Sequence, residues 1–184
     1  MKKVIFPIVS LLCFIISCQQ PKKQTQDELI KTASQSKTIN VGKNNYAFIV
    51  PSGWKSLDTI KSGVHLHQLT SPKNEEGDMA CFNIINESMS GHSFDEYFSK
   101  AIADLNTTMP DLNIIDEGEI DSMGLKKHWM HYTATLNGNK WELVVYIIPK
   151  NGVAYVLTGG SKPGTFKRYR SSFDKIAKSF HFVD

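Results

Sequence analysis

The alternation of apolar and polar residues predicts a chain built mainly of β-strands. Side chains that alternate along a segment favour a strand with one buried face, as in YAFIV, where Tyr46, Phe48 and Val50 share a face. Two longer segments, KKHWMHYTATL and KWELVVYIIP, are joined by Asn-Gly-Asn, which is typical of a tight hairpin turn. Further strands are predicted in TINV, GVHLHQLTS, MACFNIINE, LNIIDEGEID and GVAYVLTGG.

Two other segments have the spacing of amphipathic helices. Ser93 and Glu96 form a capping box at the start of the first, and Pro110 ends it. The second extends from Thr165, the expected N-cap, to about Phe180. Apolar residues recur every three or four positions in both: Phe94, Phe98, Ile102, Leu105 and Met109 in the first, and Phe166, Tyr169, Phe173, Ile176, Ala177 and Phe180 in the second.

The predicted order is four strands, a helix, four strands and a helix. Short turns between successive strands require antiparallel pairing, and amphipathic helices need an apolar surface to cover. We therefore predict an α+β fold, an antiparallel β-sheet covered by helices in an α/β/α sandwich. The chain of 184 residues suits one such domain, from residue 38 to 184.

The stretch YAFIVPSGW raises a separate question, because its largest side chain directly follows a chain-breaking turn. Pro51 in the second position and Gly53 in the fourth suit a type I turn. Trp54 could serve as a ligand platform or as a plug in the core. We expect the plug, because burial of an indole removes a large apolar area from water.

The first residues, MKKVIFPIVSLLCFIISC, differ from the rest of the chain. Lys2 and Lys3 precede an apolar run that is too short for a membrane span and suits a signal peptide. The run ends in IISC, which resembles the lipobox of bacterial lipoproteins. This resemblance implies a signal peptide at residues 1–17, lipidation of Cys18, and a polar, flexible tether over residues 18–37. The alternative is an ordinary secretory signal.

Lipidation would fix the cellular location of the protein. Each buried methylene contributes about 0.8 kcal/mol, so several acyl chains would anchor it permanently in a membrane of the bacterial cell envelope. Gln19, rather than Asp, follows the cysteine, which resembles an address in the outer membrane facing the periplasm; the choice between inner and outer membrane depends on the organism. Cys81 is then expected to be a small buried residue without an intramolecular disulfide, because Cys18 would be acylated.

Three stretches together resemble the PsbP-like or Mog1-like group of proteins. They are the Pro-x-Gly-Trp corner that ends at Trp54, the central antiparallel strands, and the ending FDKIAKSFHF with its Ile-x-x-Ser-Phe pattern. The resemblance covers about residues 38–184. The group includes accessory subunits of photosystem II, a factor that helps a small GTPase shed nucleotide, and chaperones for secreted toxins. It therefore implies a binding protein without catalysis or a cofactor.

Two histidines are weak candidates for a metal site. His65 and His67 stand two apart in a predicted strand, so both project to one face, where two imidazoles could chelate zinc or copper. A third ligand would have to come from His92, His128, His131 or a carboxylate. The alternative is two solvated or packed histidines, and no metal is assigned.

Charge is distributed unevenly along the chain. Basic residues gather near the C-terminus and acidic ones in residues 111–121, which indicates two solvated faces, a docking surface, or attraction to anionic head groups. The Gly-rich TGGSKPGTFKRYR could bind an anion at a helix start, but lacks the Gly-Lys-Ser/Thr of a phosphate loop. The candidate partner surface is Lys162, Lys167, Arg168 and Arg170; the acidic residues are Asp111, Asp116, Glu117, Glu119 and Asp121.

Little in the sequence indicates an enzyme. Gly-x-Ser-x-Gly, His-Glu-x-x-His and Cys-x-x-Cys are missing from it, and a formal net charge of +3 does not favour nucleic acid as a partner. We expect a lipid-anchored, periplasm-facing accessory protein that binds a protein partner. The alternatives are an immunity or chaperone-like protein that binds a toxin or secreted effector and, less favoured, a metal-binding protein or an enzyme.

Overall fold

The computed structural model describes residues 37–41, 46–61 and 64–183. The predicted signal peptide, Cys18 and nearly all of the predicted tether lie outside this range. The described residues form ten strands and two helices: β1 (Lys37–Val41), β2 (Tyr46–Val50), β3 (Lys55–Lys61), β4 (Val64–Thr70), β5 (Cys81–Ser88), α3 (Phe94–Thr108), β6 (Asn113–Ser122), β7 (Leu125–Leu136), β8 (Asn139–Lys150), β9 (Val153–Ser161), α4 (Phe166–Ser179) and β10 (His181–Phe182).

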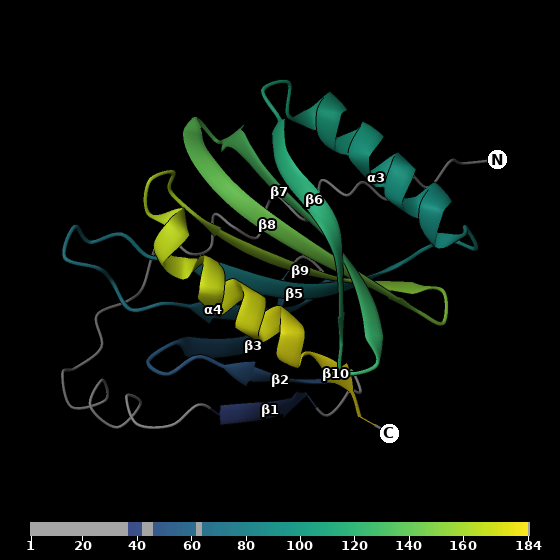
Figure 1. Ribbon diagram of the computed structural model, residues 1–184, viewed down its shortest axis with the longest axis horizontal. Helices are drawn as coiled ribbons and strands as arrows, with labels where there is room; N and C mark the ends of the chain where they lie inside the picture. Colours follow the sequence, from purple (N-terminus) through teal and green to yellow (C-terminus); the bar gives the residue numbers. More distant parts are fainter. Residues whose placement is uncertain (1–36, 42–45, 62–63, 184) are drawn as a thin grey trace.

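Seven strands form the main sheet, in the order β3-β4-β5-β9-β8-β7-β6, and every neighbouring pair is antiparallel. A smaller sheet contains β1, β2 and β10. Helix α4 and the small sheet lie on one side of the main sheet, and α3 lies apart from them (Figure 1). The predicted α+β fold is thus confirmed.

The sequence analysis missed two strands. The edge strand β3 leaves Leu57 and Ile60 exposed at 55% and 71%, and these two residues project to opposite faces, so no apolar alternation marks it. Strand β10 has two residues, too few for any pattern. The predicted hairpin between β7 and β8 is confirmed: Asn137 and Gly138 form its turn with φ of 49° and 76°, as in a type I′ turn.

The Pro-Ser-Gly-Trp corner is a turn, but not of the predicted type. The amide of Trp54 donates to the carbonyl of Pro51 at 3.1 Å, which makes Gly53 the third residue of the turn. Its φ of 77° is the left-handed value that the third position of a type II turn requires. The assignment to type I is therefore wrong, because the turn starts one residue later than predicted.

Trp54 is a plug in the core, as predicted. Its side chain is 6% exposed and meets the rings of Tyr169 and Phe173 edge-on, with centroids 6.3 and 6.0 Å away. Both rings belong to α4, so the corner after β2 is packed against this helix. Close to Phe173, an added Cβ on Gly159 would lie only 2.6 Å from the ring, so α4 also packs tightly on β9.

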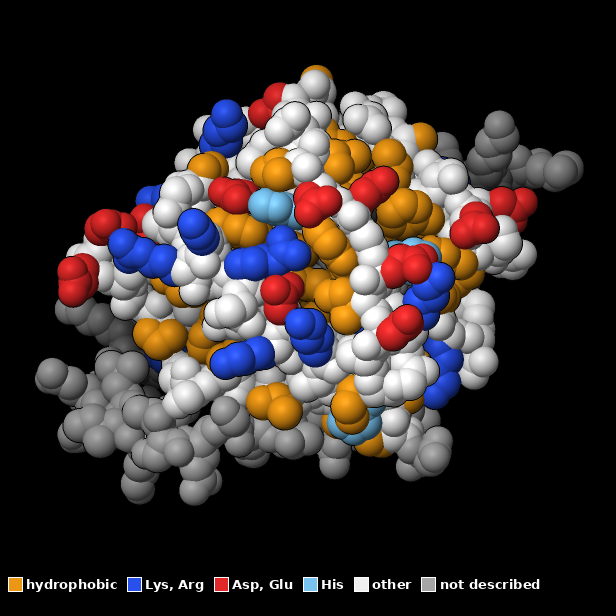
Figure 2. All heavy atoms as spheres, in the orientation of Figure 1, with side chains coloured by type: hydrophobic (Ala, Val, Ile, Leu, Met, Phe, Trp, Pro, Cys, Tyr) orange, Lys and Arg blue, Asp and Glu red, His pale blue; other side chains and the backbone are white. Residues whose placement is uncertain are grey.

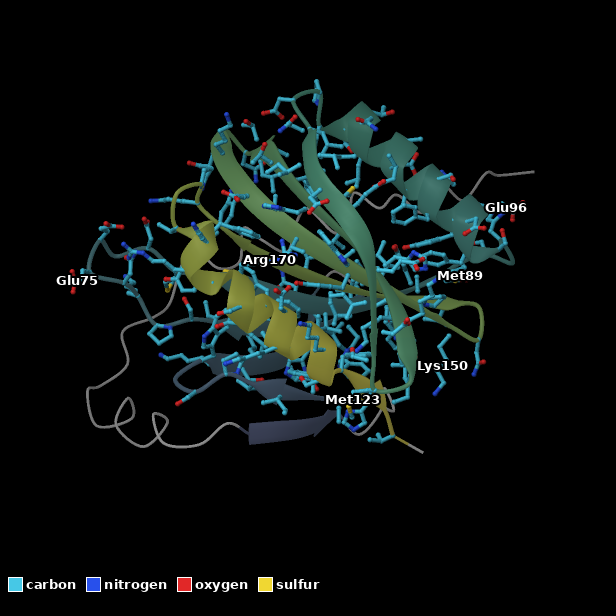
Figure 3. The ribbon with its side chains drawn as sticks, viewed as in Figure 1. Glu75, Met89, Glu96, Met123, Lys150 and Arg170 are labelled. Atoms are coloured by element: carbon cyan, nitrogen blue, oxygen red, sulfur yellow. The ribbon has the colours of Figure 1, made fainter. Side chains whose placement is uncertain are left out.

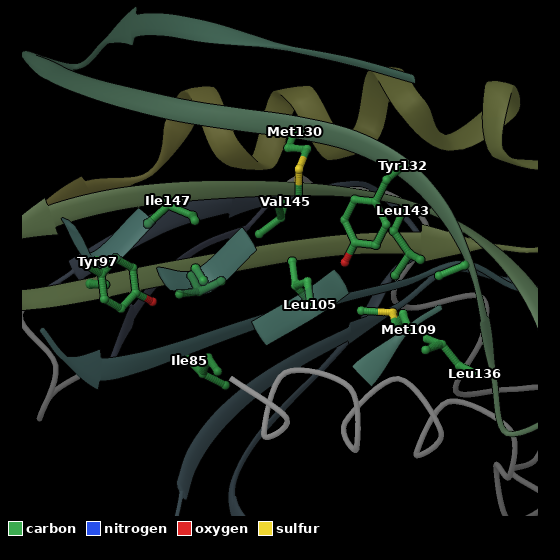
Figure 4. Packing of buried hydrophobic residues seen from close by; sticks show 14 of the residues in the cluster. Ile85, Tyr97, Leu105, Met109, Met130, Tyr132, Leu136, Leu143, Val145 and Ile147 are labelled. Carbon is green, nitrogen blue, oxygen red and sulfur yellow. The ribbon is translucent and has the colours of Figure 1, made fainter. Parts of the chain in front are cut away.

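A second core lies between the sheet and α3, and Figure 4 shows buried side chains that belong to it, among them Tyr97 and Leu105. The capping box is present, since Ser93 accepts from the amide of Glu96 and the Glu96 carboxylate accepts from the Ser93 amide. The buried stripe is rotated from the predicted one: Tyr97, Ala101 and Leu105 are buried, whereas Phe94, Phe98 and Ile102 are only partly buried.

Helix α3 is fixed to β5 by a polar contact as well. The hydroxyl of Tyr97 donates to the carboxylate of Glu87. Burial raises the pKa of Glu87, so this carboxyl group accepts its proton more readily than an exposed glutamate would.

Cys81 is buried in β5, with 2% exposure, as predicted. However, it is disulfide-bonded in this structure, and its partner lies outside the described residues. The expectation of no intramolecular disulfide concerned the mature chain, which would lack residues 1–17 and have an acylated Cys18, so this bond in the full-length chain does not test it. Neither described helix has the length and apolar character to span a membrane.

We predict that Trp54→Ala lowers the free energy of unfolding by about 3–5 kcal/mol, because it leaves a cavity among Tyr169 and Phe173. Urea denaturation measures the change. The exposed Leu57→Ala serves as the control and should shift stability by no more than about 0.5 kcal/mol. Equal effects of the two substitutions would contradict the role of Trp54 as a core residue.

Candidate functional site

Helix α4 is held on the main sheet by three alternate residues of β7. Lys127, Trp129 and His131 project to the same side of the sheet, and each contacts a different part of α4. We call these three residues the β7 row. Lys127 reaches the C-terminal end of the helix, Trp129 its middle and His131 its first turn.

Lys127 is fully buried and makes no ion pair with any described residue. Its ammonium group donates to the carbonyls of Ala177 and Phe180, at 2.7 and 2.9 Å, and to Ser122 Oγ at 2.9 Å. The last carbonyls of a helix have no partner within the helix, and they carry its partial negative charge. A buried lysine therefore replaces water as the cap of α4 and joins it to β6 and β7.

Burial lowers the pKa of Lys127 to about 8 from an ordinary 10.5, because the charged form loses its hydration. The group is thus mainly a cation at pH 7. The carbonyl oxygens around it stabilise that charge by hydrogen bonds.

Trp129 forms the centre of a cluster between α4 and the sheet. The guanidinium of Arg170 lies 5.0 Å from the centroid of the Trp129 ring, a cation–π contact. Arg170 Nε also donates to Asp174 Oδ1 at 3.0 Å, and the same oxygen accepts from the hydroxyl of Tyr146. Figure 3 labels Arg170 between α4 and the strands of the sheet. This cluster holds the guanidinium in one place.

The environment of Tyr146 strengthens this arrangement. Burial, together with the bond to Asp174, raises the pKa of Tyr146, so its hydroxyl remains a donor at every physiological pH. Gly118 of β6 lies close to Trp129, since a Cβ there would be only 3.2 Å from the indole ring. Strand β6 therefore also holds the ring in place.

His131 completes the β7 row at the start of α4. Its ring stacks on Phe166, with centroids 4.7 Å apart and planes 9° from parallel. Its Nε2 lies 3.0 Å from Glu142 Oε1. His128 lies on the opposite face of the sheet and packs against Phe94 of α3, with ring centroids 4.3 Å apart.

The cluster around Trp129 is partly open to solvent. The side chains of Arg170 and Asp174 are 26% and 28% exposed, and Trp129 is half-buried. A tryptophan and an arginine held rigid by neighbouring groups have the composition of a protein-binding hot spot. The arrangement offers a partly exposed indole and guanidinium donors.

The four predicted partner residues have different environments. Lys162 pairs with Asp78 at 2.5 Å, and Arg170 is held by Asp174. Lys167 and Arg168 are exposed and, within the described part of the chain, form no ion pair. Two further lysines of α4 share this condition, so the exposed cations are Lys167, Arg168, Lys175 and Lys178, which we call the cationic stripe. Figure 2 shows basic side chains gathered where α4 lies.

Thr165 stands at the N-cap position of α4, as predicted, but its side chain does not cap the helix. Its hydroxyl donates to the carbonyl of Lys162 at 2.9 Å and lies 3.2 Å from Ser161 Oγ. The first turn also contains no acidic residue. The positive end of the helix is therefore not offset by an anionic side chain of that turn.

His65 and His67 share a face, as predicted, but have separate partners. His65 Nε2 lies 2.7 Å from Asp58 Oδ1, and His67 Nε2 lies 2.7 Å from Ser56 Oγ. Burial lowers the pKa of His67 to about 4, so its ring is neutral at pH 7. The described residues include no group of three or more His, Cys, Asp or Glu side chains placed to hold a metal ion.

The acidic segment lies along the edge strand β6 and the turn before it. Asp111 accepts from both the amide and the hydroxyl of Thr135. Glu119 pairs with Lys126 at 2.7 Å, and the hydrogen bond from this lysine lowers the pKa of Glu119. Asp111 and Glu119 thus hold the edge of the sheet, and strand β6 also contacts α4.

Most of the residues that form this site were not predicted from the sequence. Lys127, Trp129, Tyr146 and Asp174 were not singled out, although the alternation in KHWMH did place Lys127, Trp129 and His131 on one face of a strand. That signal could have indicated a shared surface. It could not have shown that the surface faces α4, because the helix is distant in the sequence.

No protein family model and no curated protein matches the chain in sequence. Solved structures do match in fold. LpqN of Mycobacterium tuberculosis, described as involved in cell envelope biogenesis, has a TM-score of 0.60 and 13% identity, over 90% of this chain and 100% of its own. PsbP of the cyanobacterium Synechocystis has a TM-score of 0.59 and 15% identity, over 80% and 92% of the two chains.

The Ran-binding protein Mog1p of Saccharomyces cerevisiae gives a similar result, with a TM-score of 0.58 and 12% identity, over 82% of this chain and 96% of its own. At such identities the likeness concerns the fold alone. It confirms the PsbP-like and Mog1-like architecture that the sequence indicated.

The lowered pKa of Lys127 predicts a specific dependence of stability on pH. Between pH 8 and 10.5 the unfolded chain keeps this proton while the folded one loses it, so the free energy of unfolding should rise with pH, by up to about 3 kcal/mol. Tyrosine ionisation opposes this rise, but equally in the wild type and in Lys127→Met. The free energy of unfolding of the wild type minus that of Lys127→Met, measured by urea denaturation, should therefore increase from pH 7 to 10.5. A constant difference would contradict the prediction.

Proposed function

We propose that the protein is a lipid-anchored, non-catalytic accessory protein of the bacterial cell envelope that binds a protein partner from the periplasmic side. The observation that carries the proposal is the partly exposed Trp129–Arg170 contact, held by Asp174 and Tyr146. The lipobox-like IISC supports the anchor. The fold is compatible with such a role, since LpqN, described as involved in cell envelope biogenesis, shares it.

Energetic considerations favour a protein as the ligand of this site. Tryptophan and arginine are enriched among residues that contribute most to protein binding. Arg170 is held by Asp174, and Trp129 packs against Arg170 and close to Gly118. Little side-chain entropy would then be lost on binding, and more of the contact energy would appear as affinity.

Photo-crosslinking in cells tests the partner site. Asp116 is exposed and lies opposite His131 in the register of β6 and β7, on the same side of the sheet as Trp129. A crosslinking amino acid at this position should capture a defined protein. The same group at Ser99, exposed on α3, should not. Purification of the adduct and mass spectrometry identify the captured protein.

With the partner in hand, Trp129→Ala and Arg170→Gln should each weaken binding about thirtyfold, as expected for hot-spot residues. Phe98→Ala, which removes a partly buried aromatic residue from α3, is the matched control and should bind as the wild type does. Titration calorimetry measures the affinities, and circular dichroism confirms that each variant folds. Wild-type affinity in both Trp129→Ala and Arg170→Gln would contradict the site.

The anchor is tested separately, by the intact mass of the protein purified from membranes. The mature chain should begin at Cys18 and carry covalently bound acyl chains, and Cys18→Ser should lose both the cleavage and the lipid. A mature chain with another first residue and no lipid would contradict the lipoprotein assignment. It would leave the Trp129–Arg170 site untouched.

A further inference from the structure

The outward surface of α4 is a separate, purely cationic feature. Four basic residues fall within a sector of about 100° on the helix and extend over about 16 Å, by 3.6 residues per turn and 1.5 Å per residue. The single acidic residue of α4, Asp174, is bound to Arg170 and Tyr146. The residues of this stripe are Lys167, Arg168, Lys175 and Lys178, all exposed.

The position of the stripe adds to its positive potential. Lys167 and Arg168 stand in the first turn of α4, where the helix has its own partial positive charge and where cations are unfavourable for the helix. Neither Thr165 nor an acidic side chain of this turn offsets that charge. Helix stability therefore does not account for the two cations, whereas attraction of an anionic surface does.

The composition of the stripe distinguishes between two kinds of anionic surface. Lysine is depleted in protein interfaces, which depend on apolar and aromatic anchors. Three of the four cations are lysines, and the apolar residues of α4 face the core: Phe166, Phe173, Ile176 and Ala177 are buried. A contact made by charge alone is typical of attraction to anionic lipid head groups.

We propose that the cationic stripe places α4 against the head groups of an anionic membrane, so that the domain lies on the bilayer in a fixed orientation. This inference deepens the proposed function, because a lipid on Cys18 would keep the domain within reach of that surface. Arg170 and Trp129 lie at the flank of α4 rather than on the stripe. They would remain accessible to a protein partner while the stripe contacts the membrane.

The orientation can be measured with the full chain reconstituted into vesicles. A fluorescent amino acid is placed at Ser171, in the middle of the stripe, or at Ser99 on α3; both positions are exposed. The vesicles are phosphatidylcholine alone or phosphatidylcholine with one third phosphatidylglycerol, and each contains a quencher at head-group depth. We expect quenching at Ser171 only when phosphatidylglycerol is present, and no quenching at Ser99.

Two charge variants complete the test. Glutamine at Lys167, Arg168, Lys175 and Lys178 should abolish the quenching, since four cations change membrane partitioning by more than about a hundredfold at low salt. The control variant has glutamine at four other exposed lysines, Lys73, Lys100, Lys126 and Lys140, so its net charge changes by the same amount. It should still show the quenching at Ser171. Quenching that is missing in the wild type, or is equal in the two variants, would overturn the proposal.

A different outcome is that the variant with glutamine at the four stripe residues loses its crosslink to the protein partner and keeps the quenching. That result would overturn the membrane proposal and show that the stripe contacts a protein. The comparison does not depend on Cys18 processing, because every variant has the same N-terminal segment and differs only in α4 or at the control lysines. An unlipidated Cys18 would therefore refute the anchor without affecting this result. The two proposals thus fail in distinguishable ways.

Discussion

The buried ammonium group of Lys127 is the interaction on which the arrangement of α4 depends. It joins the last carbonyls of the helix to β7 and, through Ser122, to β6. A buried cation without a carboxylate partner is costly, and only several well-placed oxygen atoms make it tolerable. The hydrogen bonds of Lys127 therefore fix the end of the helix relative to β6 and β7.

The rest of the candidate site follows from this constraint. With the C-terminal end of α4 set by Lys127 and its first turn set by the stack of His131 on Phe166, Arg170 lies over Trp129. The bond from Tyr146 to Asp174 is then available to hold the guanidinium. The outward side of α4 is fixed by the same contacts, which gives the cationic stripe its direction. One strand thus positions two different surfaces.

Much of the fold could be predicted from the sequence, because it depends on local signals. Alternation marked most strands, Asn137 and Gly138 marked a hairpin, and Ser93 with Glu96 marked a helix start. Trp54 was correctly placed in the core, although the turn before it was assigned to the wrong type. Strand β3 was missed because its apolar residues face solvent at a sheet edge, where no pattern of burial is imposed.

The site was harder to predict, because it depends on contacts between distant segments. Lys127 lies in a Lys-Lys-His sequence that is typical of a solvated surface, and only the tertiary structure shows that its charge is buried. Arg170 was selected as one of several basic residues, but the sequence could not show that Asp174 and Trp129 hold it while Lys167 and Arg168 stay exposed. The sequence shows which residues of a helix are charged. It does not show which of those charges are held by residues of the sheet.

Hydrogen exchange of α4 in Lys127→Met tests the central claim most directly. If Lys127 fixes the helix as a unit, amide exchange should accelerate from the last turn back through Arg170 to Phe166, because loss of the C-terminal attachment would also loosen the packing of α4 on the sheet. Faster exchange limited to the last turn, near Ala177, would contradict the account. It would show that Lys127 is a local cap and that the remaining contacts of the β7 row hold α4 without it.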